Sequence, residues 1–166
     1  MDKYYYLISS LPLLKFYERP AISKEDFLAE SKKWLSAGDF VVLSALNVNH
    51  FIADKKDTPL LKQWKDFEYS IRSQLSLFRT ARGKNQEYKM QKDINEIIQA
   101  GNNPLEIEQA LLFFRWGFLE EQEIEHFFDL DFLIIYCLKL QILERLFTFD
   151  NEKGKQRFEE LSTVAL

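Results

Sequence analysis

The longest unbroken run of apolar residues extends from Phe132 to Leu138, inside a segment that covers residues 129–147 and reads DLDFLIIYCLKLQILERLF. A helix that is apolar on almost every side is either buried inside a protein or spans a membrane. Lys139 ends this run long before the roughly 20 apolar residues that a bilayer crossing requires. The pattern therefore predicts a buried central helix, with the other helices of the protein packed around it.

Helix-start signals and helical spacing of apolar residues recur along the rest of the chain. Ser23, Thr58 and Asn103 are good N-caps, and a proline follows each of the last two at the first helical position. The predicted helices cover residues 23–37, 40–46, 58–82, 86–100, 105–120, 129–147 and 151–162. The sequence thus predicts a mainly α fold, a single compact bundle of about six to seven helices in one domain that covers residues 1–166.

The N-terminal segment Tyr4–Ile8 departs from this helical pattern. Its sequence, YYYLI, is aromatic and ends in a β-branched residue, which favours a short strand or an extended segment laid into the core. Phe40–Leu43 is the one stretch that can pair with it, and this stretch fits either a strand or a short helix. A two-stranded element is marginal by itself, so helix remains the expected dominant class.

Composition narrows the class of protein further. The chain has 166 residues, 15 of them phenylalanine, and a formal net charge of −4. This charge argues against general nucleic-acid binding, which needs a basic surface. The single cysteine, Cys137, lies in the apolar run and is expected to be a small buried hydrophobe. No secretion signal begins the sequence, so we expect a cytoplasmic protein that does not insert into the membrane.

Basic residues gather beside the apolar stripe of the helix predicted at 58–82. This basic strip consists of Lys65, Arg72, Arg79, Arg82 and Lys84. Such a strip is either a solvated helix flank or a surface that binds an acidic partner protein, since charged strips steer association without identifying the partner. It is the best candidate for a functional surface in the sequence.

Lys139 lies on the apolar side of the central helix, where an ammonium group needs a partner. The polar residues of this helix gather on the opposite side, which we expect to face solvent: Gln141, Glu144, Arg145 and Thr148. The preceding helix carries Glu108 between two apolar faces, and short connections favour antiparallel neighbours. We therefore predict a partly buried Lys139–Glu108 ion pair, with Arg115 as the rival partner of Glu108. A Lys139 that snorkels or contacts a partner is the alternative.

Catalytic motifs are sparse. Glu123 and His126 have the Glu-x-x-His spacing that supplies two metal ligands from one helix, but a di-metal site needs two such motifs and further carboxylates. A solvated acidic turn is the expected interpretation, and a small metal-dependent enzyme is the alternative. The sequence contains no Gly-rich phosphate loop and no Gly-x-Ser-x-Gly motif. We therefore expect no enzymatic activity, no cofactor and no metal.

Three segments resemble a known bacterial family: YYYLISSLP, NPLEIEQALLFFRWGFLEE and FFDLDFLIIYCLKLQILERLFTFDNEKGKQRFEEL. The biochemical activity of this family is unknown, and its members occur with the subunits of V/A-type (vacuolar-like) ATPases. The family is distantly similar to the C-type subunit of the central stalk, which forms a funnel on the rotor ring. That component is much longer, and this chain has room for about one of its helical domains.

The resemblance implies a non-catalytic coupling part that sits between the membrane rotor ring and the central axle and transmits torque. Its expected partners are other V/A-type ATPase subunits of the ring or the axle, and its expected location is cytoplasmic and peripheral on the inner membrane through the ATPase. The alternative within the same resemblance is an assembly or regulatory adaptor outside the rotor.

Overall fold

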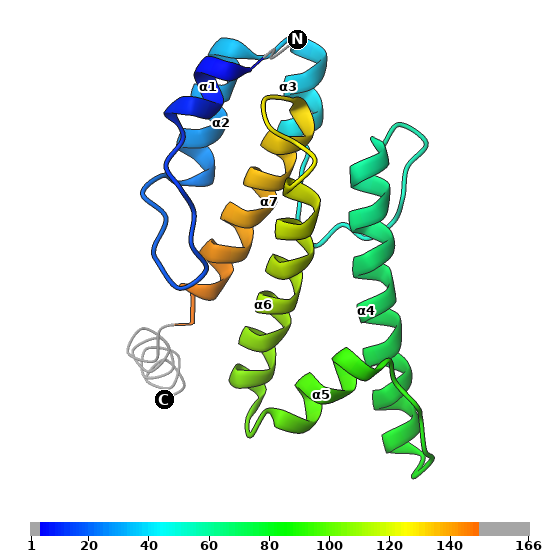
Figure 1. Ribbon diagram of the computed structural model, residues 1–166. Helices are drawn as coiled ribbons and strands as arrows, with labels where there is room; N and C mark the ends of the chain where they lie inside the picture. The colour runs from blue at the N-terminus through cyan, green and yellow to red at the C-terminus, as the bar shows by residue number, and fades with distance from the viewer. Residues whose placement is uncertain (1–3, 150–166) are drawn as a thin grey trace, which may run out of the picture.

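The computed structural model describes residues 4–149, which form seven α-helices and no strand (Figure 1). The helices are α1 (Tyr5–Ser10), α2 (Lys24–Trp34), α3 (Ala37–Ser44), α4 (Pro59–Gly83), α5 (Lys92–Ala100), α6 (Pro104–Glu123) and α7 (Leu130–Leu146). The prediction of a compact, mainly α-helical protein is confirmed. The helix expected at 151–162 lies outside the described residues.

The helix starts follow the capping signals of the sequence. The side chains of Ser23, Thr58, Asn103 and Asp129 each accept a hydrogen bond from the backbone N–H three residues later. Such a bond satisfies one of the N–H groups that a helix leaves unpaired at its start. The positions of α2, α4, α6 and α7 were therefore predictable from local sequence.

The N-terminal segment is helical, so the predicted strand is wrong. Tyr4, Leu7 and Ile8 are buried on one side of α1, a spacing of three and four residues that suits a helix packed on the core. The Tyr4 hydroxyl donates a hydrogen bond to Asp39, and the Tyr4 N–H donates to the Phe128 carbonyl over 3.3 Å. Packing and these bonds override the β propensity of the YYYLI sequence.

Two other predicted boundaries were also wrong. Ser36 caps α3, which begins at Ala37, so the helix expected at 40–46 starts three residues earlier. α5 begins at Lys92, because residues 86–91 form a link instead of the first turns of the helix. Gln74 of α4 fixes this link by accepting a hydrogen bond from the Gln91 N–H over 2.7 Å.

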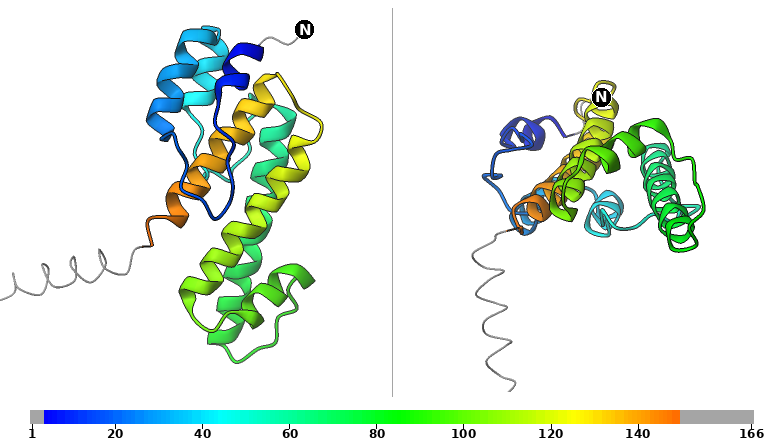
Figure 2. Two further views of the ribbon diagram at one scale, coloured as in Figure 1. Left: turned by 60° about the vertical axis from the view of Figure 1, so that its left-hand side comes forward. Right: turned by 90° about the horizontal axis from the view of Figure 1, so that it is seen from below.

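The central helix α7 is the most buried element, as the apolar run predicts. Twelve of its 17 residues are buried, Cys137 among them. It packs against α6, α2 and α3. Figures 1 and 2 show α1 and α2 on one side of the α6–α7 pair, and α4 and α5 on the other side. A smaller apolar cluster, Ile71, Met90, Ile94 and Leu111, joins α4, α5 and α6.

Candidate functional site: a cleft lined by arginines

Four arginine side chains from three helices line one cleft. Arg72 and Arg79 come from α4, Arg115 from α6 and Arg145 from the last turn of α7. The cleft has a volume of about 450 Å³, and the loop at residues 48–51 closes one side of it. We call this feature the arginine cleft.

A buried carboxylate holds two of these arginines in place. Glu68 of α4 is fully buried, and its carboxylate accepts hydrogen bonds from Nε and Nη2 of Arg115. It also accepts one from Nε of Arg72 over 3.1 Å. An arginine fork matches a carboxylate with two parallel donors, which fixes orientation as well as distance. Glu68 thus ties α4 to α6 beneath the cleft.

The remaining contacts orient the arginines at the cleft wall. Nη2 of Arg72 donates to the Asn49 side chain over 3.2 Å, and its guanidinium lies 4.9 Å from the centre of the Phe51 ring. Nε of Arg145 donates to Glu108 over 2.7 Å. Both arginines are partly exposed, with 36% and 47% of their side-chain surface accessible.

The arginine cleft carries uncompensated positive charge. Its four arginines face two carboxylates, those of Glu68 and Glu108, which leaves a local charge of +2. Arg79 is exposed and makes no hydrogen bond or ion pair within residues 4–149. Its donors are therefore available to an anionic group. In a chain whose net charge is −4, this concentration of positive charge is a local feature of one cleft.

The structure divides the predicted basic strip. Arg72 and Arg79 line the cleft, whereas Arg82 and Lys84 lie at the exposed end of α4 beyond it. Lys65 is not available to a partner, because its ammonium group lies 2.8 Å from both carboxylate oxygens of Asp57. Burial alone raises the pKa of Asp57, but hydrogen bonds from Lys65 and from the Asp54 backbone outweigh it and lower that pKa.

The predicted Lys139–Glu108 ion pair is wrong. Lys139 is buried as expected, but its ammonium group pairs with Glu123 and lies 4.9 Å from the centre of the Trp116 ring. Glu108 pairs with Arg145 at the other end of α6. Helical side chains lean toward the N-terminus of their helix. In α7 that end lies beside the C-terminal end of α6, where Glu123 is, so Lys139 reaches Glu123.

The expected solvent-facing side of α7 is partly covered. Gln141 is buried, and its side-chain oxygen accepts a hydrogen bond from the Val48 N–H over 3.0 Å. Glu144 accepts one from the Lys24 N–H over 2.9 Å. Both side chains pair backbone groups of α2 and of the loop after α3, so they hold these segments on the central helix. Only Arg145 and Thr148 of the four are exposed.

The Glu-x-x-His motif does not form a joint pair of ligands. Glu123 turns to Lys139, whereas Nδ1 of His126 lies 2.7 Å from Asp129. The possible ligand atoms of His126, Asp129 and Asp131 lie within 4.8 Å of one another, the one such group among the described residues. Asp129 caps α7, where the helix dipole favours an anion over a cation. We therefore assign this group to helix capping.

Cys137 lacks the surroundings of a nucleophile. It is fully buried, and burial raises the pKa of its thiol to about 11. A reactive cysteine needs a thiolate and access to solvent. The prediction of a small buried hydrophobe is confirmed.

Sequence reasoning missed Glu68 and Arg145 as parts of the cleft. Glu68 was not among the candidate residues, and Arg145 was expected on the solvent-facing side of the central helix. The signal available was weak: Glu68 and Arg72 are four residues apart on one helix, a spacing at which side chains meet. Whether Arg115 of α6 and Arg145 of α7 reach the cleft depends on how these helices are rotated relative to α4, and helix periodicity alone does not determine that rotation.

The fold and the cleft together define a small helical protein with an arginine-lined cleft. The family described as "Protein of unknown function (DUF2764)" matches residues 76–164, more than half of the chain, and the chain belongs to this family. Arg79, Arg115 and Arg145 lie within the matched region, and Arg72 lies before it. No curated protein and no solved structure matches the chain. In the part of the chain that the structure describes, no helix has both the length and the apolar character to cross a bilayer.

Proposed function

We propose that this chain is a non-catalytic subunit or accessory protein of a V/A-type ATPase, and that it binds an acidic segment of another subunit in the arginine cleft. The observation that carries the docking surface is the Arg79 guanidinium, which has no hydrogen bond or ion pair within residues 4–149 and lines the same cleft as the partly exposed Arg72 and Arg145. Arginine is the side chain best suited to bind carboxylates at an interface.

The ATPase part of the proposal rests on the resemblance of the three segments quoted above, because the matched family has no described activity. A coupling part must transmit force without deforming. The fully buried middle of α7 and the tie from Glu68 to Arg115 are consistent with such a stiff body.

A protein carboxylate suits the cleft better than a nucleotide does. Among the described residues, Phe51 is the one aromatic residue that lines the cleft. Its ring is 4.9 Å from the Arg72 guanidinium and is stacked with Tyr69, with 6.4 Å between ring centres. These contacts already engage the ring, which makes it a poor platform for stacking a base.

The proposal is tested by capture of the tagged chain from its native host, read by mass spectrometry. Wild-type protein should recover V/A-type ATPase subunits, and Arg79→Glu should lose them because it reverses the free charge in the cleft. Arg82→Glu is the matched control, since it makes the same change on the same helix outside the cleft lining. Both residues are exposed, so both variants should keep the wild-type thermal midpoint.

The outcomes separate the two parts of the proposal. Absence of ATPase subunits from the wild-type capture overturns the ATPase assignment. Equal capture by wild type and Arg79→Glu excludes the arginine cleft as the docking surface. The amount of this chain in the purified ATPase then distinguishes the two roles, because a rotor subunit is present in fixed stoichiometry and an assembly or regulatory adaptor is not.

A further inference from the structure

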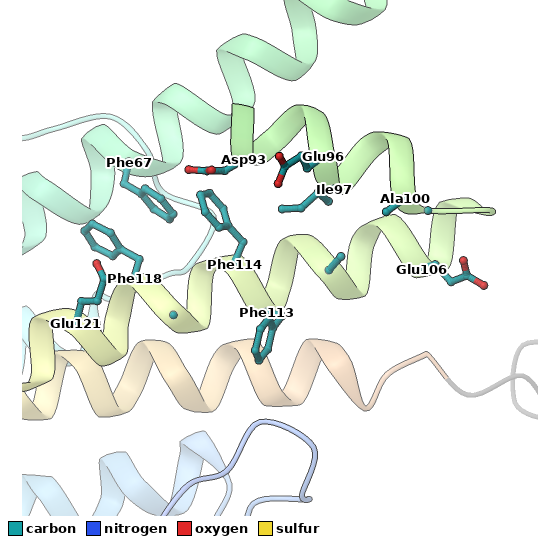
Figure 3. A pocket seen from close by; sticks show the side chains of 13 residues that line it. Phe67, Asp93, Glu96, Ile97, Ala100, Glu106, Phe113, Phe114, Phe118 and Glu121 are labelled. Carbon is teal, nitrogen blue, oxygen red and sulfur yellow. The ribbon is translucent and has the colours of Figure 1, made fainter. Parts of the chain in front are cut away.

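A second hollow lies between α5 and α6, on a different side of α6 from the arginine cleft. Figure 3 shows it from close by. Its volume is about 890 Å³, and its apolar floor is formed by Phe67, Ile97, Phe114 and Phe118. The Phe67 and Phe118 rings are stacked with their centres 4.2 Å apart, which joins α4 to α6 at one end of the hollow. We call this feature the acidic groove, after its rim.

Every charged residue that lines the acidic groove is a carboxylate: Asp93, Glu96, Glu106 and Glu121. Hydrogen bonds from the Asn102 backbone and side chain lower the pKa of Glu106. Glu96 approaches Lys92 at 3.8 Å on the exposed surface. Asp93 and Glu121 have no ion pair or hydrogen bond within the described part of the chain. Of the four carboxylates, only that of Glu96 has a cationic partner within the described residues.

The side of α6 that faces the groove has the spacing of a helix-packing surface. Ala110, Phe114, Gly117 and Glu121 follow one another at intervals of four, three and four residues. This interval is the one at which a helix presents side chains to a second helix beside it. A second helix packed along this face would contact these four positions in turn.

Gly117 leaves the surface of α6 open beside the groove. It lies inside a helix of 20 residues, where glycine is less favourable than alanine. A Cβ atom added there would meet no atom within 4 Å, so the packing of the described chain does not require glycine. The absence of a side chain leaves room at this point for a second backbone to lie close to α6.

We propose that the acidic groove binds an amphipathic helix of a partner protein, with apolar residues on the face that enters the groove and lysine or arginine on the flanks. The apolar floor of the groove accepts the apolar face of that helix, and the four rim carboxylates attract its lysine or arginine side chains. The same carboxylates repel anionic lipid and nucleic acid. The arginine cleft attracts the opposite charge, so the groove is a separate surface. Its assignment goes beyond the proposed function, because it does not depend on the partner being an ATPase subunit.

The proposal is tested on the full chain with two synthetic amphipathic peptides. Both peptides carry leucine at helical spacing, and their flanking positions are lysine in one and glutamate in the other. Calorimetry should show one lysine peptide bound per chain and no binding of the glutamate peptide. Gly117→Leu should weaken binding at least about tenfold by filling the groove. Gly38→Leu is the matched control, because a Cβ at that position also meets no atom within 4 Å and it lies outside the groove.

A pair of charge reversals separates the groove from a general effect of net charge. Glu96→Lys with Glu121→Lys should abolish binding, whereas Glu18→Lys with Asp54→Lys changes net charge equally at exposed positions elsewhere and should leave it intact. Equal loss in both double variants, or undiminished binding by Gly117→Leu, overturns the proposal. A wild-type dimer that Gly117→Leu dissociates, seen by sedimentation, also overturns it, because the occupant is then a second copy of this chain.

Discussion

The buried contact between Glu68 and Arg115 is expected to be the most sensitive point of the fold. Arg115→Met keeps an unbranched side chain of similar length and removes the charge. It leaves the fully buried Glu68 carboxylate with Arg72 as its remaining partner. The carboxylate cannot reach water, so the loss of its principal partner must appear in the free energy of unfolding.

The magnitude follows from the burial of the pair. Removing one partner of a buried ion pair destabilises a protein by about 3–5 kcal/mol. Arg72 still donates to Glu68 over 3.1 Å, so we expect the lower end, about 3 kcal/mol. For a chain of this length each kcal/mol lowers the thermal midpoint by roughly 2–4 °C. Arg115→Met should therefore melt roughly 6–12 °C below wild type.

Thermal unfolding followed by far-ultraviolet circular dichroism measures this difference. Arg145→Met is the control, since its pair with Glu108 is partly exposed and is worth at most about 1 kcal/mol. Adding Glu68→Leu to Arg115→Met should recover part of the loss, because it removes the stranded carboxylate. If Arg115→Met and Arg145→Met melt at the same temperature, the reasoning about the buried carboxylate is refuted.

Three further effects are expected. Glu123→Gln should destabilise the protein by about 1–3 kcal/mol, because it leaves the buried Lys139 ammonium group unpaired. Lys139→Met should destabilise it by less, because the Glu123 carboxylate that it leaves unpaired is partly exposed. Chemical denaturation of the two variants and wild type measures the difference. Gly117→Ala should stabilise α6 by about 0.5–1 kcal/mol in the same assay. The lowered pKa of Asp57 contributes stability above its ordinary pKa, which is lost as the pH falls through the lower folded value. The melting points of wild type and Asp57→Asn should thus differ at neutral pH and converge as the pH falls through the lowered pKa of Asp57.

Local sequence was sufficient to place most helices. A cap followed by proline marks the first residues of α4 and α6, and both helices begin at that proline. The apolar run predicted the burial of α7 because no helical face within Phe132–Leu138 carries a charge. The strand prediction for the N-terminal segment was wrong because β propensity is a weak preference, which packing on the core reverses.

Pairing between helices could not be predicted in the same way. Lys139 and Glu108 were correctly assigned to adjacent helices, but they lie too far apart along these helices to pair. Lys139 pairs with Glu123 near the C-terminal end of α6, and Glu108 pairs with Arg145 near the N-terminal end of α6. Such contacts depend on the position of each residue along two antiparallel axes and on the lean of its side chain. The arginine cleft, assembled from α4, α6 and α7, depends on the same information for three helices at once.

The central claim is that the arginine cleft contacts a V/A-type ATPase subunit, and site-specific photo-cross-linking in the native host tests it most directly. A photo-reactive residue replaces Leu75, which lines the cleft, and a control chain carries it at the exposed Ser9 of α1. We predict that the residue at position 75 cross-links to a segment of an ATPase subunit rich in aspartate and glutamate, and that the control does not. A chain that cross-links to no ATPase subunit, or equally well from both positions, would contradict the account.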